Sequence, residues 1–383
     1  MAADPKVCFV TLILSQYRVP FHLRVRDILS EQGIDYQLIY SDPTGDAAAK
    51  GDTVALDWAT RVPVSTFALA GQTFHWQSAL SNVRESDLTI VSQENKLLLN
   101  YWLQFRYMLF GKPMGFFGHG RSSASGRFPK IGRFLKRFLA THVHWWFAYT
   151  PEVADLLVEY GFPSDRISIN YNSIDTTALL DELESISQSE IDTFLKSHGV
   201  RPGRIGLYLG ALYTDKRISF LIEAAHRVRK HVPDFELLIV GAGPQAHLAE
   251  EAAAAHDFIH YSGPLFGRDK AIALKVSRAC LLPGAVGLAI LDTFAAALPL
   301  ITTSAPGHGP EVNYLKNGEN GILLDEADSS LAYSDAIIRV MTDDAFSNRL
   351  GAGARASADL YSIENMAQHF CKGVVAALGR NKA

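Results

Sequence analysis

The sequence predicts an α/β fold made of two doubly wound domains. Short apolar runs with the length of buried parallel strands alternate with amphipathic segments, and this alternation occurs twice along the chain. A polar, helix-forming connection from about residue 176 to 203 separates the two series. The 383 residues are enough for two or three domains, and 48% hydrophobic with 20% charged residues is typical of a globular protein.

The first series opens with a βαβ unit. Residues 7–14 (VCFVTLIL) form a near-continuous apolar run, Pro20 suits the first turn of a helix that continues to about Glu31, and residues 36–40 form a second strand. Such a unit is expected to be right-handed. The first loop lacks the G-x-G-x-x-G pattern, so the sequence gives no dinucleotide fingerprint there.

The first series continues with four more strands. Residues 44–75 look irregular and poor in helix signals, whereas Thr150 and Pro151 suit the N-cap and first position of a helix. The strands are expected at 87–92, 112–117, 145–149 and 167–171, with helices at 97–109 and 128–139.

The second series repeats the alternation and ends in helices. Strands are expected at 205–209, 236–240, 259–261, 280–282, 298–302 and 321–324, with helices at 218–230, 244–255, 269–276 and 288–297. Three helical segments then complete the chain.

A tight turn at residues 283–287 (PGAVG) joins a strand to a helix. Proline ends the strand ladder and glycine permits a positive φ. A turn of this kind directs backbone N–H groups and the positive end of the helix dipole at one point, which suits a phosphate or a sugar oxygen. An ordinary βα turn without a ligand is the alternative.

This stretch resembles the signature of the family-4 retaining glycosyltransferases, which reads Glu-Gly-Phe-Gly, four residues, Glu, and then Gly-x-Pro. Gly284 stands at the first family Glu, Asp292 at the second, and Ala297 at the last family Gly. The resemblance implies a GT-B fold, in which two Rossmann-like domains face a cleft. It further implies an acceptor domain at 1–175, a nucleotide-sugar domain at 176–362, and a C-terminal helix at 363–383 that packs back on the first domain.

The resemblance implies a donor site at the strand ends of the second domain. Lys216 matches the family lysine that binds the donor diphosphate, whereas Ala211 replaces the family arginine, so Arg217 or Arg18 is a candidate substitute. Asp292 takes the place of the carboxylate that binds the ribose hydroxyls. The implied donor-binding residues are Gly210, Lys216, Arg217, Gly241, Gly243, Leu265, Gly284, Ala285, Val286, Gly287, Leu288 and Asp292.

Further candidates lie mainly in the first domain. His119, between two glycines at the end of a strand, resembles the family histidine that faces the donor and is the candidate catalytic residue; a structural histidine is the alternative. Tyr17, Arg18 and Glu311 are candidate diphosphate or acceptor contacts.

Gly284 is the main departure from the family pattern, because it carries no carboxylate near the transferred sugar. Three explanations are open. In the first, the transition state is stabilised instead by the diphosphate, by His119 and by the N–H groups of Val286, Gly287 and Leu288. In the second, the donor sugar needs no carboxylate at this position, and in the third, activity is lost. We favour a different donor sugar, because the rest of the phosphate-binding frame is kept.

The region between Asn95 and Pro151 holds nine Lys or Arg and no Asp or Glu, within a chain of net charge −4. Two explanations are open: a solvated helix face, which is the usual meaning of such residues and needs no partner, or a patch that binds an anionic membrane surface. Nucleic acid is not expected, since the remainder is acidic and no binding motif occurs. The membrane or anion patch is expected at Arg127, Lys130, Arg133, Lys136 and Arg137.

The sequence shows no pattern of metal ligands, so neither a metal nor another cofactor is expected. Three widely spaced cysteines and no recognisable signal peptide predict a cytoplasmic protein, with a peripheral place at the inner face of a membrane as an option. The resemblance implies metal-independent, retaining transfer of a sugar from a nucleoside diphosphate to a saccharide or lipid-linked acceptor, in bacterial polysaccharide, lipopolysaccharide or glycolipid synthesis. A non-catalytic GT-B subunit and, less favoured, a sugar-nucleotide epimerase or a phosphorylase are the alternatives.

Overall fold

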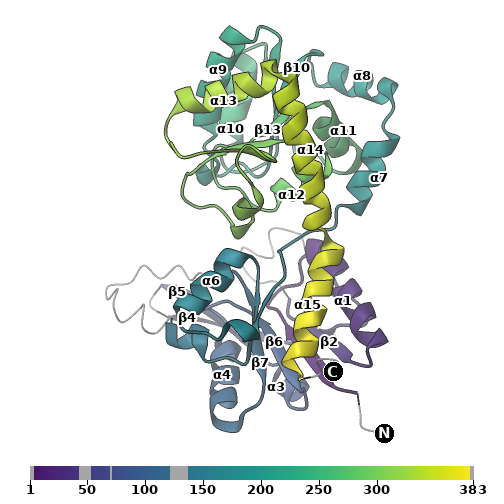
Figure 1. The fold of residues 1–383 in the computed structure, drawn as a ribbon, viewed down its shortest axis with the longest axis vertical. Coiled ribbons are helices and arrows are strands. Elements are labelled where there is room, and N and C mark those ends of the chain that lie inside the picture. The colour runs from purple at the N-terminus through teal and green to yellow at the C-terminus, as the bar shows by residue number, and fades with distance from the viewer. Residues whose placement is uncertain (1–3, 43–52, 70, 121–136, 380–383) are drawn as a thin grey trace. The chain divides into compact units, whose positions relative to one another are not determined.

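A computed structural model describes residues 4–42, 53–69, 71–120 and 137–379 of the protein. The chain divides into two compact units (Figure 1). Unit 1 comprises residues 1–174 and 363–383, and unit 2 comprises residues 175–362. Each unit is built around its own parallel sheet, and the predicted α/β, doubly wound fold class is confirmed.

Unit 1 contains a seven-stranded parallel sheet in the order β3-β2-β1-β6-β7-β8-β9. The central strands are almost entirely buried because helices cover both faces of the sheet. Its strands are β1 (Lys6–Val10), β2 (Asp35–Tyr40), β3 (Thr60–Arg61), β6 (Leu88–Ser92), β7 (Met114–Gly118), β8 (Trp145–Ala148) and β9 (Ile167–Ile169).

The helices of unit 1 include one from the far end of the chain. Helix α15 (Ile363–Ala377) lies along α1 and also contacts β8 and β9 (Figure 1). Phe370 of α15 packs among Phe9, Phe21 and Phe117, with ring centroids 5.2–6.0 Å apart. Unit 1 also contains α1 (Val19–Glu31), α3 (Leu80–Val83), α4 (Leu98–Phe110) and α6 (Pro151–Glu159), and residues 137–141 are helical as well.

An antiparallel hairpin corrects the expectation that residues 44–75 are irregular. Strands β4 (Val64–Leu69) and β5 (Gln72–Gln77) pair in register, with Phe67 opposite Phe74. Every residue of β4 after Val64 is exposed, so the strand has no buried face. Hydrophobic alternation, the usual signal of a half-buried strand, is therefore missing from this segment.

Unit 2 contains a six-stranded parallel sheet in the order β12-β11-β10-β13-β14-β15. Its strands are β10 (Arg204–Leu209), β11 (Phe235–Val240), β12 (Ile259–Gly263), β13 (Ala279–Leu281), β14 (Leu300–Thr303) and β15 (Gly321–Leu324). Its helices are α7 (Thr177–Ser185), α8 (Gln188–Ser197), α9 (Ile218–His231), α10 (Ala246–Ala255), α11 (Gly267–Val276), α12 (Ala289–Ala295), α13 (Ser330–Thr342) and α14 (Asp344–Leu360).

Both sheets have a topological switch point, where the chain stops adding strands on one side and continues on the other. It lies between β1 and β6 in unit 1 and between β10 and β13 in unit 2. Open parallel sheets bind ligands outside the carboxyl ends of the strands at this point. The two switch points are therefore the first places to look for function. No helix in the described part of the chain is long and apolar enough to cross a membrane.

Candidate functional site

The loops that follow β10 and β13 meet at the switch point of unit 2, and their backbones touch. The amide of Ala285 donates to the carbonyl oxygen of Asp215 at 2.9 Å. A Cβ atom placed on Gly284 would lie 2.1 Å from the same oxygen. Position 284 therefore has no room for a side chain, and the absence of the family carboxylate is built into the packing of the two loops.

Lys216 lies over this turn. Its Nζ donates to the carbonyl oxygen of Ala285 and lies 3.9 Å from Asp215. About a fifth of its side chain is exposed. Burial lowers the pKa of Lys216, while Asp215 acts in the opposite direction. The structure thus places a partly desolvated cation beside the glycine turn, although the two are separated by 68 residues of sequence.

The turn after β11 packs just as closely against the turn after β10. Gly241 and Gly243 have φ angles of +149° and +156°. Their Cβ atoms would lie 1.8 Å from the carbonyl oxygen of Gly210 and 2.5 Å from that of Leu212. Only glycine fits both conformation and space. The resulting surface at the strand ends is made of bare backbone.

The backbone of the signature turn is held from the side by His308. The amide of Val286 donates to Nδ1 of His308 at 3.0 Å, and Nε2 of His308 donates to the carbonyl oxygen of Thr303 at 2.8 Å. Burial lowers the pKa of His308, as does nearby Lys216, which keeps the ring neutral. The Val286 amide is therefore engaged, contrary to its expected role. Within the described chain, Gly287 and Leu288 donate their amides to no other residue.

Asp292 lies in the short helix α12 and forms an ion pair with Lys270 of α11, with 3.0 Å between Oδ1 and Nζ. The carboxylate is partly exposed, with 14% of the side chain accessible. Lys270 is a residue that sequence reasoning missed. The sequence does not indicate this pair, because a lysine 22 positions before an aspartate belongs to no recognised motif.

Arg217, a candidate for binding the donor diphosphate, already forms hydrogen bonds and an ion pair within unit 2. Its guanidinium donates to the carbonyl oxygen of Ala327 and pairs with Asp328 at 2.7 Å. The same group lies 4.2 Å from the centre of the Phe220 ring. These contacts join the start of α9 to the connection between β15 and α13. The Arg217 guanidinium also donates to the hydroxyl of Thr303 at 3.4 Å, so it is engaged by several groups of unit 2.

Two other candidates in unit 2 lie near the strand ends. Glu311 is buried, and its Oε2 would lie only 2.4 Å from a Cβ atom placed on Gly309. The amide of Gly309 in turn donates to the carbonyl oxygen of Val286 at 2.8 Å. Glu311 therefore lies behind the signature turn. Leu265 follows β12 and is half-buried.

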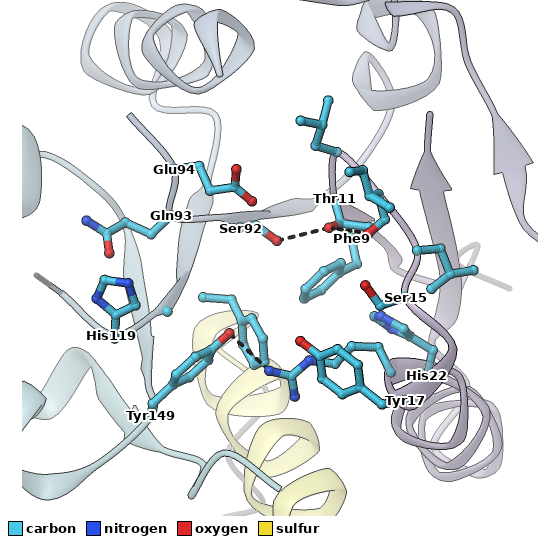
Figure 2. Close-up of a pocket in the computed structure, with 16 residues that line it drawn as sticks. Phe9, Thr11, Ser15, Tyr17, His22, Ser92, Gln93, Glu94, His119 and Tyr149 are labelled. Atoms are coloured by element: carbon cyan, nitrogen blue, oxygen red, sulfur yellow. Dashed lines mark hydrogen bonds between the residues drawn. The ribbon is translucent and has the colours of Figure 1, made fainter. Parts of the chain in front are cut away.

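Unit 1 has a cavity of about 420 Å³ at its own switch point, shown in Figure 2. Its lining comes from the loops after β1 and β6 and from the ends of β7 and β8. Three residues selected from the sequence, Tyr17, Arg18 and His119, are brought together here. The polar residues of the lining are Thr11, Ser15, Tyr17, Arg18, His22, Ser92, Gln93, Glu94, His119 and Tyr149.

Arg18 is held at one side of this cavity. Its guanidinium donates to Tyr149 at 3.3 Å and to the side-chain oxygen of Asn172. His22 is fully buried, and burial together with Arg18 lowers its pKa to about 3. Its Nδ1 lies 2.7 Å from the hydroxyl of Tyr36. His22 is therefore neutral near pH 7, and His119 is the exposed imidazole of the lining.

Most of the expected anion patch lies outside the described residues, namely Arg127, Lys130, Arg133 and Lys136. Arg137 is described, and its Nε donates to the carbonyl oxygen of Tyr160 at 2.6 Å. Among the described residues, no group of three or more His, Cys, Asp or Glu is arranged to hold a metal ion.

Comparisons with known proteins agree with this architecture. Residues 23–178 match the family model described as Glycosyltransferase Family 4, and residues 203–343 match the model described as Glycosyl transferases group 1. The first match begins after β1 and falls almost entirely on unit 1, and the second falls on unit 2, where it includes β10 and β13. The chain belongs to glycosyltransferase family 4.

Individual relatives match this family-4 chain over shorter stretches than the two family models do. A phosphatidyl-myo-inositol mannosyltransferase from Mycobacterium leprae is 28% identical over 41% of the chain and 42% of its own length. The chain thus matches less than half the length of this relative.

Solved structures of the GT-B fold match over nearly the whole chain. A glycosyltransferase from Rickettsia africae has a TM-score of 0.70 at 14% identity, over 99% of this chain and 100% of that one. HepE from Anabaena, solved in complex with UDP, has a TM-score of 0.65 at 13% identity, over 97% and 100%. The GT-B fold of this family-4 protein is therefore shown.

Proposed function

We propose that the protein transfers a sugar from a nucleoside-diphosphate sugar to a hydroxyl group of a saccharide or lipid-linked acceptor. The proposal rests on the position of Lys216, whose ammonium group lies over a glycine turn without side chains at the switch point of unit 2. Backbone that is stripped of side chains lets a diphosphate approach closely, and a nearby cation neutralises it. The mannosyltransferase relative and the UDP complex of HepE support this assignment.

Within this proposal, leaving-group stabilisation comes from Lys216 and from the amides of Gly287 and Leu288. These groups direct positive charge at the leaving diphosphate. No carboxylate is needed among them to hold a metal ion against the diphosphate. We therefore propose turnover without a divalent metal. We also propose that the reaction retains the configuration of the sugar, in line with the family signature that residues 284–299 resemble.

The packed turn at Gly284 bears on the donor sugar. A carboxylate cannot project from this position, because Asp215 and Lys216 fill the space around it. We propose that the donor sugar differs from those of relatives that carry the family Glu, and that it is bound through its hydroxyls by backbone groups. A non-catalytic binding subunit is the second candidate, favoured by Ala211 and by the contacts that already engage the Arg217 guanidinium.

We also propose that unit 1 docks on an anionic membrane through the exposed face of α4. This helix contains no acidic residue and exposes large apolar side chains, with Phe105 54%, Leu109 58% and Phe110 71% accessible. It lies in the stretch that carries nine Lys or Arg and no Asp or Glu. Apolar insertion combined with positive charge is the usual basis for binding to anionic bilayers. The protein would then work at the cytoplasmic face of a membrane, on lipid-linked acceptors of polysaccharide, lipopolysaccharide or glycolipid synthesis.

The first test is a thermal-shift screen of the protein with UDP, GDP, ADP, CDP and TDP, each with and without EDTA. We expect one diphosphate to raise the melting temperature equally in both conditions, and the corresponding sugar nucleotides to be consumed by the protein alone or with an acceptor. Lys216→Ala should reduce the shift, whereas Lys196→Ala, at an exposed lysine on α8, should keep it. Binding without turnover of any sugar nucleotide would favour the non-catalytic subunit, and the absence of binding would refute the donor site.

A further inference from the structure

We propose that His308 is a positioning residue of the donor site. In its neutral form, with the proton on Nε2, it holds the signature turn, residues 283–287, so that the amides of Gly287 and Leu288 stay free to face the diphosphate. The proposal rests on the proposed function for the identity of the ligand, and on the contacts of His308 for everything else.

The loop that follows β14 folds over the signature turn and engages one of its residues on both sides. Nδ1 of His308 accepts from the amide of Val286 at 3.0 Å, and the amide of Gly309 donates to the carbonyl oxygen of Val286 at 2.8 Å. Val286 is buried, so its backbone groups need partners within the protein. His308 therefore fixes the orientation of the residue directly before Gly287.

Thr303 anchors this histidine to the sheet. Nε2 of His308 donates to the carbonyl oxygen of Thr303 at 2.8 Å, and the hydroxyl of Thr303 donates to the carbonyl oxygen of Pro283 at 2.8 Å. Thr303 is the last residue of β14 and is fully buried. The signature turn is thus held at its first residue by the threonine hydroxyl and at its fourth by the imidazole, and the same strand fixes both groups.

The partners of His308 permit only one protonation state of the ring. A backbone amide can only donate, so Nδ1 must be without a proton, and a carbonyl oxygen can only accept, so Nε2 must have one. Burial and the nearby Lys216 lower the pKa of His308, and the hydrogen bond to Thr303 offsets part of this. A proton added to Nδ1 would set two donors, the imidazolium and the amide of Val286, against each other and release the turn.

Three other titratable side chains lie around the turn. The ammonium group of Lys216 donates to the carbonyl oxygen of Ala285, Asp215 lies 3.9 Å from that lysine, and Glu311 is buried behind the turn. Lys216 disfavours a second positive charge on His308, whereas a bound diphosphate would favour one. The sign of the pH effect therefore separates two roles. A neutral ring that holds the turn loses the ligand when it is protonated, whereas an imidazolium that binds phosphate gains it.

The test compares the full wild-type chain with His308→Asn, His308→Ala and His231→Ala. The side-chain oxygen of asparagine can replace Nδ1 as the acceptor for Val286 and does not titrate, whereas alanine removes the contact. His231 is an exposed histidine at the end of α9 and serves as the matched control. Pyrophosphate binding is measured by calorimetry between about pH 5 and 8, the range in which histidine usually titrates. Melting temperatures establish that the variants are folded.

We expect His308→Ala to bind pyrophosphate roughly tenfold more weakly than the wild type, and His308→Asn and His231→Ala to stay within about threefold of it. As the pH falls, the wild type should lose affinity relative to His308→Asn, because the two proteins share every other titratable group. The proposal is overturned if His308→Ala binds as the wild type does, if asparagine fails to restore binding, or if acidification raises wild-type affinity relative to His308→Asn.

A measurement without ligand separates this proposal from the donor assignment. In ¹⁵N NMR spectra we expect His308 to be in the Nε2–H form at neutral pH, and the amide signal of Gly287 to shift in His308→Ala but not in His231→Ala. If these signals behave as expected but the wild type binds no pyrophosphate, the donor assignment fails and the contact that holds the turn stands. If pyrophosphate binds but the Gly287 signal is the same in His308→Ala, the positioning role alone is overturned.

Discussion

Unit 1 and unit 2 use the same topology, but their switch points carry different groups. In unit 2 the loops after β10, β11 and β13 touch through backbone, and Gly241, Gly243 and Gly284 have no space for side chains. In unit 1 the loops after β1 and β6 line an open cavity with polar side chains, including Glu94 and Arg18. Backbone amides and a half-buried lysine suit a diphosphate, whereas side-chain carboxylate and amide oxygens suit hydroxyls.

This difference also predicts how the two sites respond to mutation. A site made of touching backbone is part of the packing of its unit, so most substitutions there should cost stability. A site made of side chains around a cavity can lose one group and keep its fold. Folding and binding should therefore be coupled in unit 2 and separable in unit 1.

The largest effect is expected from Gly284→Glu, the change that restores the family carboxylate. The new Cβ would overlap the carbonyl oxygen of Asp215, 2.1 Å away, so the loops must separate. We expect unit 2 to lose about 3 kcal/mol or more of stability, measured by urea unfolding. Gly287→Ala is the matched control, because nothing lies within 4 Å of its Cβ position. A stable Gly284→Glu protein with raised activity would contradict this view of the turn.

The glycine turns could be predicted because their signal is local. Gly241, Gly243 and Gly284 lie in runs of glycine and proline directly after apolar strands, and these runs mark a turn whatever lies beside it. The sequence could not show why Gly284 must lack a side chain. That reason is Asp215, 69 residues away, which the sheet order brings against it.

The residues that sequence reasoning missed have no local pattern. Glu94 lies in a polar loop, and only the pairing of β1 with β6 places it over a cavity. Lys270 and Asp292 meet because α11 and α12 are neighbours in space. The hairpin β4–β5 was missed because its first strand is exposed on both faces. Strands and helices can thus be predicted from apolar periodicity, whereas polar contacts between loops follow from the packing itself.

The second prediction concerns membrane binding, which we expect to depend on α4 of unit 1 and not on unit 2. The double substitution of Phe105 and Leu109 by Ser should weaken binding to phosphatidylglycerol vesicles by about 2–4 kcal/mol, because both side chains would otherwise be buried in lipid. Phe266→Ser in unit 2, where the side chain is 78% exposed, should leave binding unchanged. Vesicle sedimentation at low and high salt provides the measurement. Equal binding by the double variant and the wild type would rule out α4 as the docking face.

The third prediction concerns the cation of unit 2. Lys216→Ala should weaken pyrophosphate and nucleoside-diphosphate binding by about 1.5–3 kcal/mol, the usual contribution of a hydrogen bond to a charged group, as measured by calorimetry. Because burial lowers the pKa of Lys216, the wild type should lose pyrophosphate affinity on raising the pH earlier than an ordinary lysine site would. Lys196→Ala is the control. Unchanged pyrophosphate affinity in Lys216→Ala would show that the diphosphate binds elsewhere.

The smallest effect should separate the two ends of the donor nucleotide. Asp292→Ala removes a carboxylate that can accept ribose hydroxyls and leaves Lys270 without its partner. We expect nucleoside-diphosphate affinity to fall by about 1 kcal/mol and pyrophosphate affinity to stay the same or rise slightly, because the released lysine adds positive charge. Lys216→Ala should reduce both affinities. If Asp292→Ala weakens pyrophosphate as strongly as the whole nucleotide, its role is to hold the turn in place, and unit 2 would then bind its ligand through backbone and Lys216 alone.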